Sequence, residues 1–333
     1  MKKISMAFLL LAALILAACT NPQTLPRQRV LRDGLMDTIM LITAYGEGAQ
    51  EAVGAAFERI ETIHRVADVN DPYGLTALMS VRGFADAEYL ELLEISRHAY
   101  DITGGAFNPA LGPLINLWDI GTENERVPAD DEINAALALS SFDDVAWDSF
   151  VRLRYADMQL NFGGVAKGYA ADEAAQILRG HGIEHALLDL GGDIYALGTR
   201  PDGNPWRIGI RSPLGDGAVI GIVELSDTSA MTSGSYIRYF EQDGRRYHHI
   251  FDPQTGRPAD SGLLSVTVIY ENAALADAVS TAFFVLGIER SAAILQDIPE
   301  MSVIFITDEL EIYLIGGQAQ AFSLTDDRFR IIS

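Results

Sequence analysis

Apolar residues recur every three or four positions in several segments of the chain. One such segment, residues 50–67, places Val53, Ala56, Phe57, Ile60 and Ile63 on a single helical face. This pattern predicts an amphipathic helix. Similar patterns predict further helices over residues 87–103, 132–139, 165–179 and 273–286, and the last of these is apolar almost throughout.

Shorter apolar runs predict strands. They cover residues 36–45, 186–190, 206–211, 218–225, 236–240, 247–251 and 264–270, with hairpins over 145–160 and 303–315. Strands and helices are mixed without strict alternation, which is typical of the α+β class. The chain has 333 residues, 49% of them apolar, which is enough for a sizeable core in one large domain or two small ones.

The N-terminus has the features of a secretory signal. Lys2 and Lys3 precede an apolar run over residues 6–18, and Leu16-Ala17-Ala18-Cys19 resembles a bacterial lipobox. The alternative is a transmembrane anchor, but the run is shorter than the ~20 residues that a span needs. We therefore expect a signal peptide over 1–18, a lipidated Cys19 with a tether over 19–34, and a folded domain over 35–333, held on the extracytoplasmic side of a bacterial membrane.

Charge and cysteine content exclude some functions. The formal net charge is −22, from 46 acidic and 24 basic residues, and nucleic acid binding needs patches of Lys and Arg instead. Cys19 is the only cysteine. Disulfides and thiolate metal sites are therefore excluded, and any metal must bind oxygen or nitrogen ligands.

Two diglycine turns follow predicted strands. In the first, Asn161 leads into Gly163-Gly164, and Lys167 lies in the first turn of the following helix. Glycines allow close backbone approach, and a helix N-terminus with a lysine favours an anion. The alternative is a plain turn with a solvated lysine. The second turn, in residues 188–194, could form one wall of a nucleotide pocket, although by itself it reads as a tight turn capped by an aspartate.

The apolar helix over 273–286 contains a polar pair. Asp277 and Thr281 are four residues apart and share one face. Burying them without a partner is costly, and a carboxylate with a hydroxyl suits a hard cation such as Mg²⁺. The alternative is a helix-capping aspartate and a threonine bonded to its own backbone.

Two adjacent histidines, His248 and His249, precede a predicted turn. Strand alternation would place them on opposite faces, so both cannot readily bind one metal. We expect one to pack or pair within the fold and the other to face a pocket.

Six stretches together resemble the FAD:protein FMN transferase (ApbE) family. In chain order they are GGAFNPALGPLINLW (104–118), NFGGVAKGYAAD (161–172), LDLGGDI (188–194), TSGSYIR (232–238), YHHIFDPQTGRP (247–258) and ADAVSTAFFVLG (276–287). The resemblance covers about residues 36–287. It implies a single α+β domain related to the T-fold, with mixed sheets and helices and the site in a cleft between two halves.

The resemblance also implies a reaction. Such enzymes use Mg²⁺ to split FAD and transfer FMN to a threonine hydroxyl of a partner, releasing AMP. Their acceptors are flavoprotein subunits of membrane redox complexes of the quinone reductase type. Two alternatives are an Mg²⁺-dependent FAD pyrophosphatase without a protein acceptor and a lipoprotein that binds FAD without chemistry.

Residue roles follow from the matched motifs. The implied metal ligands are Asp277, which also acts in catalysis, Thr281 and the backbone carbonyl near Gly164. His249 is implied as the base that accepts the threonine proton, which suits an imidazole. The implied flavin-nucleotide contacts are Met36, Gly105, Ala106, Phe107, Asn161, Lys167 and Phe251.

Two positions and one segment depart from the family pattern. Asn161 stands where the family more often has Asp, and Asp37 stands where Gly is common. The segment over 61–80 lacks the family's usual pattern. An extra carboxylate at Asp37 would be unfavourable near a pyrophosphate unless it points away.

Overall fold

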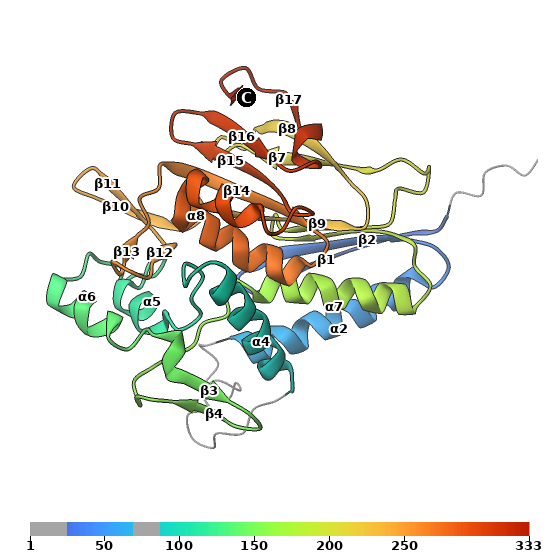
Figure 1. Cartoon of the computed structure of the whole chain (residues 1–333). Coiled ribbons are helices and arrows are strands. Elements are labelled where there is room, and N and C mark those ends of the chain that lie inside the picture. The colour runs from blue at the N-terminus through green and yellow to red at the C-terminus, as the bar shows by residue number, and fades with distance from the viewer. Residues whose placement is uncertain (1–24, 69–86, 333) are drawn as a thin grey trace, which may run out of the picture.

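The computed structural model describes residues 25–68 and 87–332, and its central feature is a nine-stranded sheet (Figure 1). In spatial order the strands are β1 (Arg27–Leu35), β2 (Thr38–Tyr45), β5 (His185–Leu190), β6 (Ile194–Leu197), β9 (Thr228–Gly234), β14 (Leu263–Tyr270), β15 (Ser302–Thr307), β16 (Glu311–Ile315) and β18 (Arg330–Ile332). Neighbouring strands are antiparallel except β16 and β18, which run parallel.

One face of the sheet is covered by helices. Figure 1 shows α2 (Ala49–Ala67), α7 (Ala166–Gly180) and α8 (Ala273–Leu295) beneath the strands, with α4 (Ala87–Ile102) beside them. Alternate residues of β2, such as Met40 and Ile42, point into this core. By length and composition α8 could cross a membrane, but it packs against β9, β14 and α7 as a core helix.

The opposite face carries a small second sheet of β7 (Trp206–Arg211), β8 (Val219–Leu225) and β17 (Ser323–Leu324). Along β7 buried and exposed residues alternate strictly. Trp206, Ile208 and Ile210 point inward to a second core, while Arg207 and Arg211 point outward. The two sheets therefore form layers on either side of this core.

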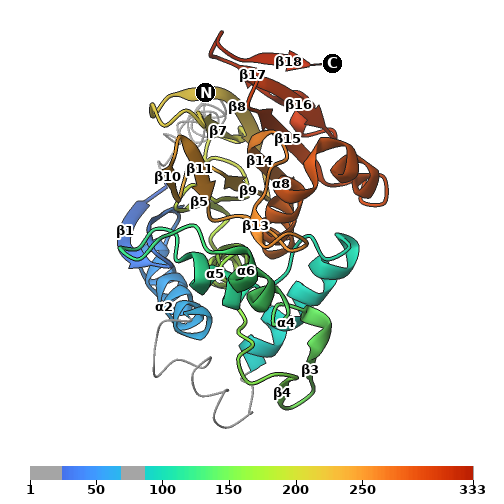
Figure 2. The same cartoon turned by 90° about the vertical axis from the view of Figure 1, so that its left-hand side faces the viewer.

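A third apolar cluster joins elements at the left-hand side of Figure 1, the side that faces the viewer in Figure 2. It joins α5 (Gly112–Trp118) and α6 (Asp130–Leu137) to the paired strands β10 (Tyr239–Gln242) and β11 (Arg245–His248), and β12 (Phe251–Asp252) and β13 (Arg257–Pro258). Trp118 is fully buried there and donates from Nε1 to the carbonyl of Gly256 at 2.9 Å. The remaining elements are η1 (Phe142–Asp144), the hairpin of β3 (Val145–Trp147) and β4 (Val151–Leu153), and η2 (Ala319–Ala321).

The α+β class is confirmed, and every predicted helix is present to within a few residues of its predicted bounds, except that α8 continues to Leu295, nine residues past the predicted end, across a kink at Gly287. The predicted tether is too long, because Arg27 to Gly34 belong to β1 and pair with β2. The predicted strand over 247–251 is wrong as a continuous element, because β11 ends at His248 and β12 begins at Phe251. Cys19, the signal peptide and most of the unusual segment over 61–80 lie outside the described residues.

Candidate functional site

The site forms where α7 crosses the start of α8. At Gly168 an added Cβ would overlap the backbone of Ala273, so only glycine permits this close contact. The amide of Gly168 donates to Oδ2 of Asp277 at 3.0 Å. The crossing thereby brings the first turn of α7, with Lys167, next to the polar face of α8.

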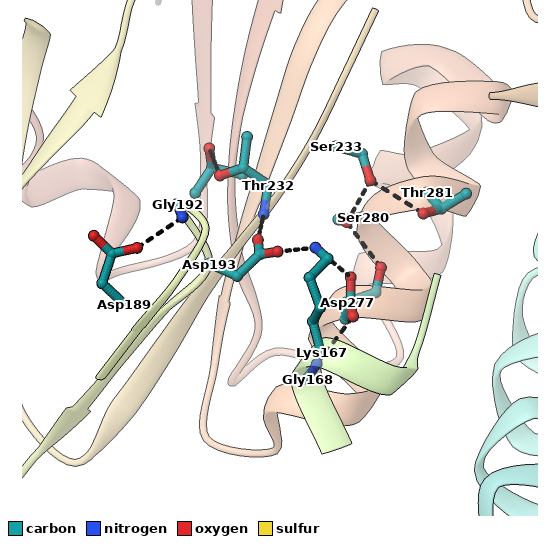
Figure 3. Close-up of polar contacts among 11 residues, drawn as sticks. Lys167, Gly168, Asp189, Gly192, Asp193, Thr232, Ser233, Asp277, Ser280 and Thr281 are labelled. Carbon is teal, nitrogen blue, oxygen red and sulfur yellow. Dashed lines mark hydrogen bonds and ion pairs between the residues drawn. The ribbon is translucent and has the colours of Figure 1, made fainter. Parts of the chain in front are cut away.

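Lys167 lies between two buried carboxylates (Figure 3). Its Nζ pairs with Oδ2 of Asp193 and lies 4.0 Å from Oδ1 of Asp277. Asp193 is 3% exposed and Asp277 is 4% exposed. Burial disfavours the charge on Lys167, but the attraction of Asp193 and Asp277 outweighs it and raises the lysine pKa above its usual range. Lys167 is therefore a fixed positive charge at neutral pH.

Burial also acts on Asp277. Loss of hydration raises the pKa of this carboxyl, while the Lys167 ammonium and the Gly168 amide oppose the rise. A buried carboxylate of this kind gains strongly from any further cation that approaches it.

A chain of hydroxyls continues from Asp277. Ser280 Oγ donates to the Asp277 carbonyl at 2.8 Å and lies 2.8 Å from Ser233 Oγ, which is 3.1 Å from Thr281 Oγ1. Ser233 belongs to β9, a strand that the hydrophobic pattern did not predict. At Gly164 an added Cβ would lie only 3.4 Å from Thr281 Oγ1, so the Gly164 backbone is next to this hydroxyl.

These groups fit a magnesium ion by their chemistry. Asp277, Thr281 and the Gly164 backbone supply a carboxylate, a hydroxyl and a carbonyl, all of them hard oxygen donors. Within residues 25–68 and 87–332 no group of three or more His, Cys, Asp or Glu side chains converges. A cation at this point would therefore complete its shell with oxygens from substrate or water.

A cavity of about 360 Å³ opens beside Lys167. Its walls come from the β1–β2 turn, the β5–β6 turn, the C-terminal end of β7 (208–211) and the segment that follows β9. The lining side chains used below are Met36, Asp37, Lys167, Arg211, Tyr236 and Arg238. Its volume is at the low end of the roughly 300–1,000 Å³ found for small-molecule sites.

Of the predicted nucleotide contacts, Met36 and Lys167 line this cavity. Phe107 is buried against Gly164 and so belongs to the metal side of the site. Gly105 and Ala106 form the turn just before it, with Gly105 at a left-handed φ of 83°. Met36 and Lys167 therefore line the cavity, whereas Phe107 packs beside the Gly164 backbone.

Two other predicted contacts have clear structural roles. Asn161 Oδ1 accepts the backbone N–H of Gly163 at 2.8 Å, and the backbone N–H of Asn161 donates to the carbonyl of Pro109 at 2.7 Å. Asn161 therefore holds the diglycine turn in place. Phe251 is 5% exposed and packs 5.8 Å from Trp118, ring centre to ring centre, in the third apolar cluster, away from the cavity lining.

The two histidines have different environments. His248 is buried, with Nδ1 accepting the amide of Ile250 at 3.3 Å and Nε2 donating to the carbonyl of Ala259 at 3.0 Å. It also contacts Phe284 edge to face. His248 therefore supports the fold, as expected for one of the pair.

His249 is partly exposed and lies next to Arg238. Its backbone amide and its Nδ1 are 3.1 and 3.2 Å from the Arg238 carbonyl. A carbonyl only accepts, so Nδ1 carries the proton and Nε2 is the free base. Burial, together with the Arg238 and Lys167 charges, lowers the pKa of His249 to about 4. The ring is therefore neutral at pH 7, the form in which Nε2 can accept a proton.

Several site residues were not identified as individual side chains from the sequence. Asp193, Thr232, Ser233, Arg211, Tyr236 and Arg238 reach the site through strand pairing and loops. Asp193 Oδ1 accepts the Thr232 amide at 2.8 Å, which links the β5–β6 turn to β9 (Figure 3). The only sequence signal was that most of these residues fall within the LDLGGDI and TSGSYIR motifs.

The mixed fold and this oxygen-rich site define a class that is already represented among solved structures. The ApbE protein from Thermotoga maritima superposes with a TM-score of 0.80 at 31% identity, covering 87% of this chain and 97% of that one. The flavin transferase ApbE from Vibrio cholerae gives a TM-score of 0.79 at 26% identity, covering 89% of this chain and all of the other.

Sequence comparison agrees with the structural class. The ApbE family model matches residues 36–305. The FAD:protein FMN transferase of Treponema pallidum is 36% identical over 321 residues, covering 89% of each chain, and one from Klebsiella pneumoniae is 37% identical over 284 residues, covering 83% of this chain and 86% of the relative. The chain belongs to the ApbE family.

Proposed function

We propose that this protein transfers FMN from FAD to a threonine hydroxyl of an acceptor flavoprotein, with Mg²⁺ as metal and AMP as leaving group. One observation supports this most directly. The Gly164 backbone, which is far in the sequence from α8, lies next to Thr281, and Asp277 of the same helix lies 4.0 Å from Lys167, which lines the cavity. The names of the relatives, which are FAD:protein FMN transferases, agree with this reading.

The proposed reaction exchanges one P–O bond for another. The threonine Oγ forms a bond to the phosphorus of the FMN half of FAD. The P–O bond to the adenylate half breaks, and the bridging oxygen leaves with its electron pair as part of AMP. The threonine proton moves to Nε2 of His249, the nitrogen left free by the Nδ1–H bond to Arg238.

The other residues bind and orient. Mg²⁺, when bound, would polarise phosphoryl oxygens and neutralise charge on the leaving group. Asp277, Thr281 and the Gly164 carbonyl would hold it. Lys167, whose pKa is raised, stays protonated and provides a fixed positive charge for the pyrophosphate. The Lys167–Asp193 ion pair keeps this ammonium in place.

The acceptor and the location are part of the same proposal. The acceptor would be a threonine-containing subunit of a membrane redox complex of the quinone reductase type. A lipid on Cys19 would hold the enzyme on the extracytoplasmic face of the same membrane system.

Product analysis separates this function from its alternatives. Soluble protein starting at Thr20 is mixed with FAD, Mg²⁺ and a threonine-containing flavoprotein domain, and flavin fluorescence on the denatured acceptor is compared with released AMP. Equal amounts of labelled acceptor and AMP are expected. AMP without label would indicate a pyrophosphatase, and bound flavin with neither product would indicate a carrier.

A further inference from the structure

Three cationic side chains line the cavity, and two of them are already paired. Lys167 is bound to Asp193, and Arg238 lies 3.4 Å from Asp37. Arg211 is the third. Within residues 25–68 and 87–332 no carboxylate forms an ion pair with Arg211 and no group accepts a hydrogen bond from it. Its guanidinium is therefore, among the described residues that line the cavity, the cation whose charge no carboxylate neutralises.

The backbone of β7 aims Arg211 at the cavity. The pairing of β7 with β8 shifts register between Ile210 and Arg211, and such an irregularity re-aims the side chain that follows it. The guanidinium lies beside the β5–β6 turn, where Nη2 would be 3.9 Å from a Cβ added to Gly192. Gly191 and Gly192 have φ values of 79° and 102°, so this wall carries no side chain that would separate a ligand from Arg211.

A second polar group faces the same space. Tyr236 lines the cavity, and its ring is packed against Gly234, where an added Cβ would overlap it. Among the described residues, none forms a hydrogen bond with the Tyr236 hydroxyl. Burial raises the pKa of this phenol, although the nearby Arg211 charge opposes the rise, so the hydroxyl remains a donor at neutral pH.

We propose that Arg211 and Tyr236 form an anion subsite that binds a phosphate group of the nucleotide substrate, which makes Arg211 a specificity-determining residue. The inference rests on the proposed function for the identity of the ligand. A planar guanidinium next to a phenol donor matches the oxygens of a phosphate. Arg211 and Tyr236 line the cavity together with Lys167, whereas Asp277 and Thr281 are not part of its lining. The subsite would therefore help to select phosphorylated nucleotides over nucleosides and riboflavin.

Binding measurements on the full-length protein in detergent test the subsite without requiring turnover. Affinities for FAD, AMP, FMN, adenosine and riboflavin are measured by calorimetry for wild type, Arg211→Gln and Tyr236→Phe. We expect Arg211→Gln to bind FAD about tenfold more weakly, and Tyr236→Phe to show a smaller loss. A similar loss of affinity should be seen with AMP if the subsite binds the adenylate phosphate, or with FMN if it binds the flavin phosphate. Adenosine and riboflavin, which have no phosphate, should bind equally well to wild type and variant.

Arg207→Gln is the matched control. Arg207 is on the same exposed face of β7 but does not line the cavity, so its loss should leave all affinities unchanged. Folded Arg211→Gln that binds FAD, AMP and FMN as tightly as wild type would overturn the subsite alone. Equal losses in Arg207→Gln and Arg211→Gln would also overturn it, in favour of a general charge effect. Wild type that binds none of the three would overturn both the subsite and the proposed function.

Discussion

Lys167, Asp193 and Asp277 bury three charges in one place, which is rarely the most stable arrangement available to a core. Apolar replacements of similar size are often as stable as a buried ion pair, because desolvation costs several kcal/mol per ion. Here the charges are held by the Gly168 and Thr232 amides as well as by one another. This is the pattern expected of a site that binds a charged ligand rather than one that only stabilises the fold.

The histidine pair allows a test at the residue scale. His249→Asn should lower FMN transfer by roughly 10²–10⁴-fold through loss of the base, while leaving the protein folded. His248→Asn should instead lower the free energy of unfolding by about 1–3 kcal/mol, through its buried hydrogen bonds. Transfer assays and urea unfolding measure the two effects. Equal effects of both variants on transfer and on stability would contradict the assignment.

The lowered pKa of His249 predicts a pH effect on stability. Above pH 6.5 the ring is neutral in both states, and it contributes no pH dependence. As pH falls from about 6.5 to about 4 the unfolded chain binds the proton first, so the folded state loses stability. Relative to His249→Asn, wild type should lose up to about 3 kcal/mol across this window. Urea unfolding at pH 7 and pH 4 measures the difference, and a constant gap between the two proteins would show that the pKa is not lowered.

Local sequence patterns were enough for part of the site. Asp277 and Thr281 are recognisable because they are polar residues four apart on an apolar helix, and Lys167 because it follows a diglycine turn. Arg211 and Ser233 could not be found in this way. Their positions depend on how β7 bends and on which strand pairs with β14, and neither is encoded within a short window.

At the scale of elements, the contact between α7 and α8 sets the geometry of the site. Asp172 of α7 accepts the amides of Ala273 and Ala274 at 3.1 and 2.9 Å, so α7 also caps the start of α8. Gly168 permits the close approach that this requires. The same contact therefore fixes both the helix packing and the separation of Lys167 from Asp277.

Gly168→Ala tests this dependence. The added methyl overlaps the backbone of Ala273, so we expect about 1–3 kcal/mol of destabilisation and a loss of transfer activity. Gly54→Ala is the control, since Gly54 is exposed in the middle of α2 with no atom within 4 Å of the added Cβ. It should stabilise the protein by about 0.5–1 kcal/mol. Chemical denaturation measures both, and a Gly168→Ala protein as stable and active as wild type would contradict the proposed role of the crossing.

Two strands that the sequence pattern missed, β9 and β1, have identifiable physical reasons. β9 reads Thr228-Ser-Ala-Met-Thr-Ser-Gly234 and is buried on both faces, so its small polar residues show no alternation. β1 is an edge strand rich in arginine and largely exposed, so it resembles a linker in composition. The amphipathic helices, in contrast, follow directly from their period. Both strands are identified by the strands they pair with, which a local sequence pattern cannot show.

At the scale of the whole molecule, charge and anchoring act together. A net charge of −22 repels an anionic dinucleotide at long range. At physiological salt this repulsion is screened beyond roughly 8 Å, so the charges that line the cavity, including Arg211, which is unpaired among the described residues, act on a bound anion at short range. Only seven residues separate Cys19 from the start of β1, which limits the proposed tether to roughly 29 Å. A lipid on Cys19 would keep the folded body close to the membrane.

Replacing Cys19 tests the anchor. In a bacterial host, wild type should incorporate labelled palmitate and fractionate with membranes, whereas Cys19→Ala should do neither. The purified variant should keep wild-type transfer activity, because Cys19 precedes the domain matched by the family model. A Cys19→Ala protein that stays in the membrane would favour a transmembrane anchor over a lipoprotein signal.

The central claim is that a magnesium-dependent transfer depends on Asp277. The most direct measurement is the rate at which flavin becomes covalently attached to a threonine-containing acceptor, for wild type and Asp277→Asn, with Mg²⁺ and with EDTA. We predict labelling by wild type that stops with EDTA, returns with excess Mg²⁺, and falls at least ~100-fold in Asp277→Asn. Labelling that persists in EDTA, or an Asp277→Asn enzyme as fast as wild type, would contradict the account.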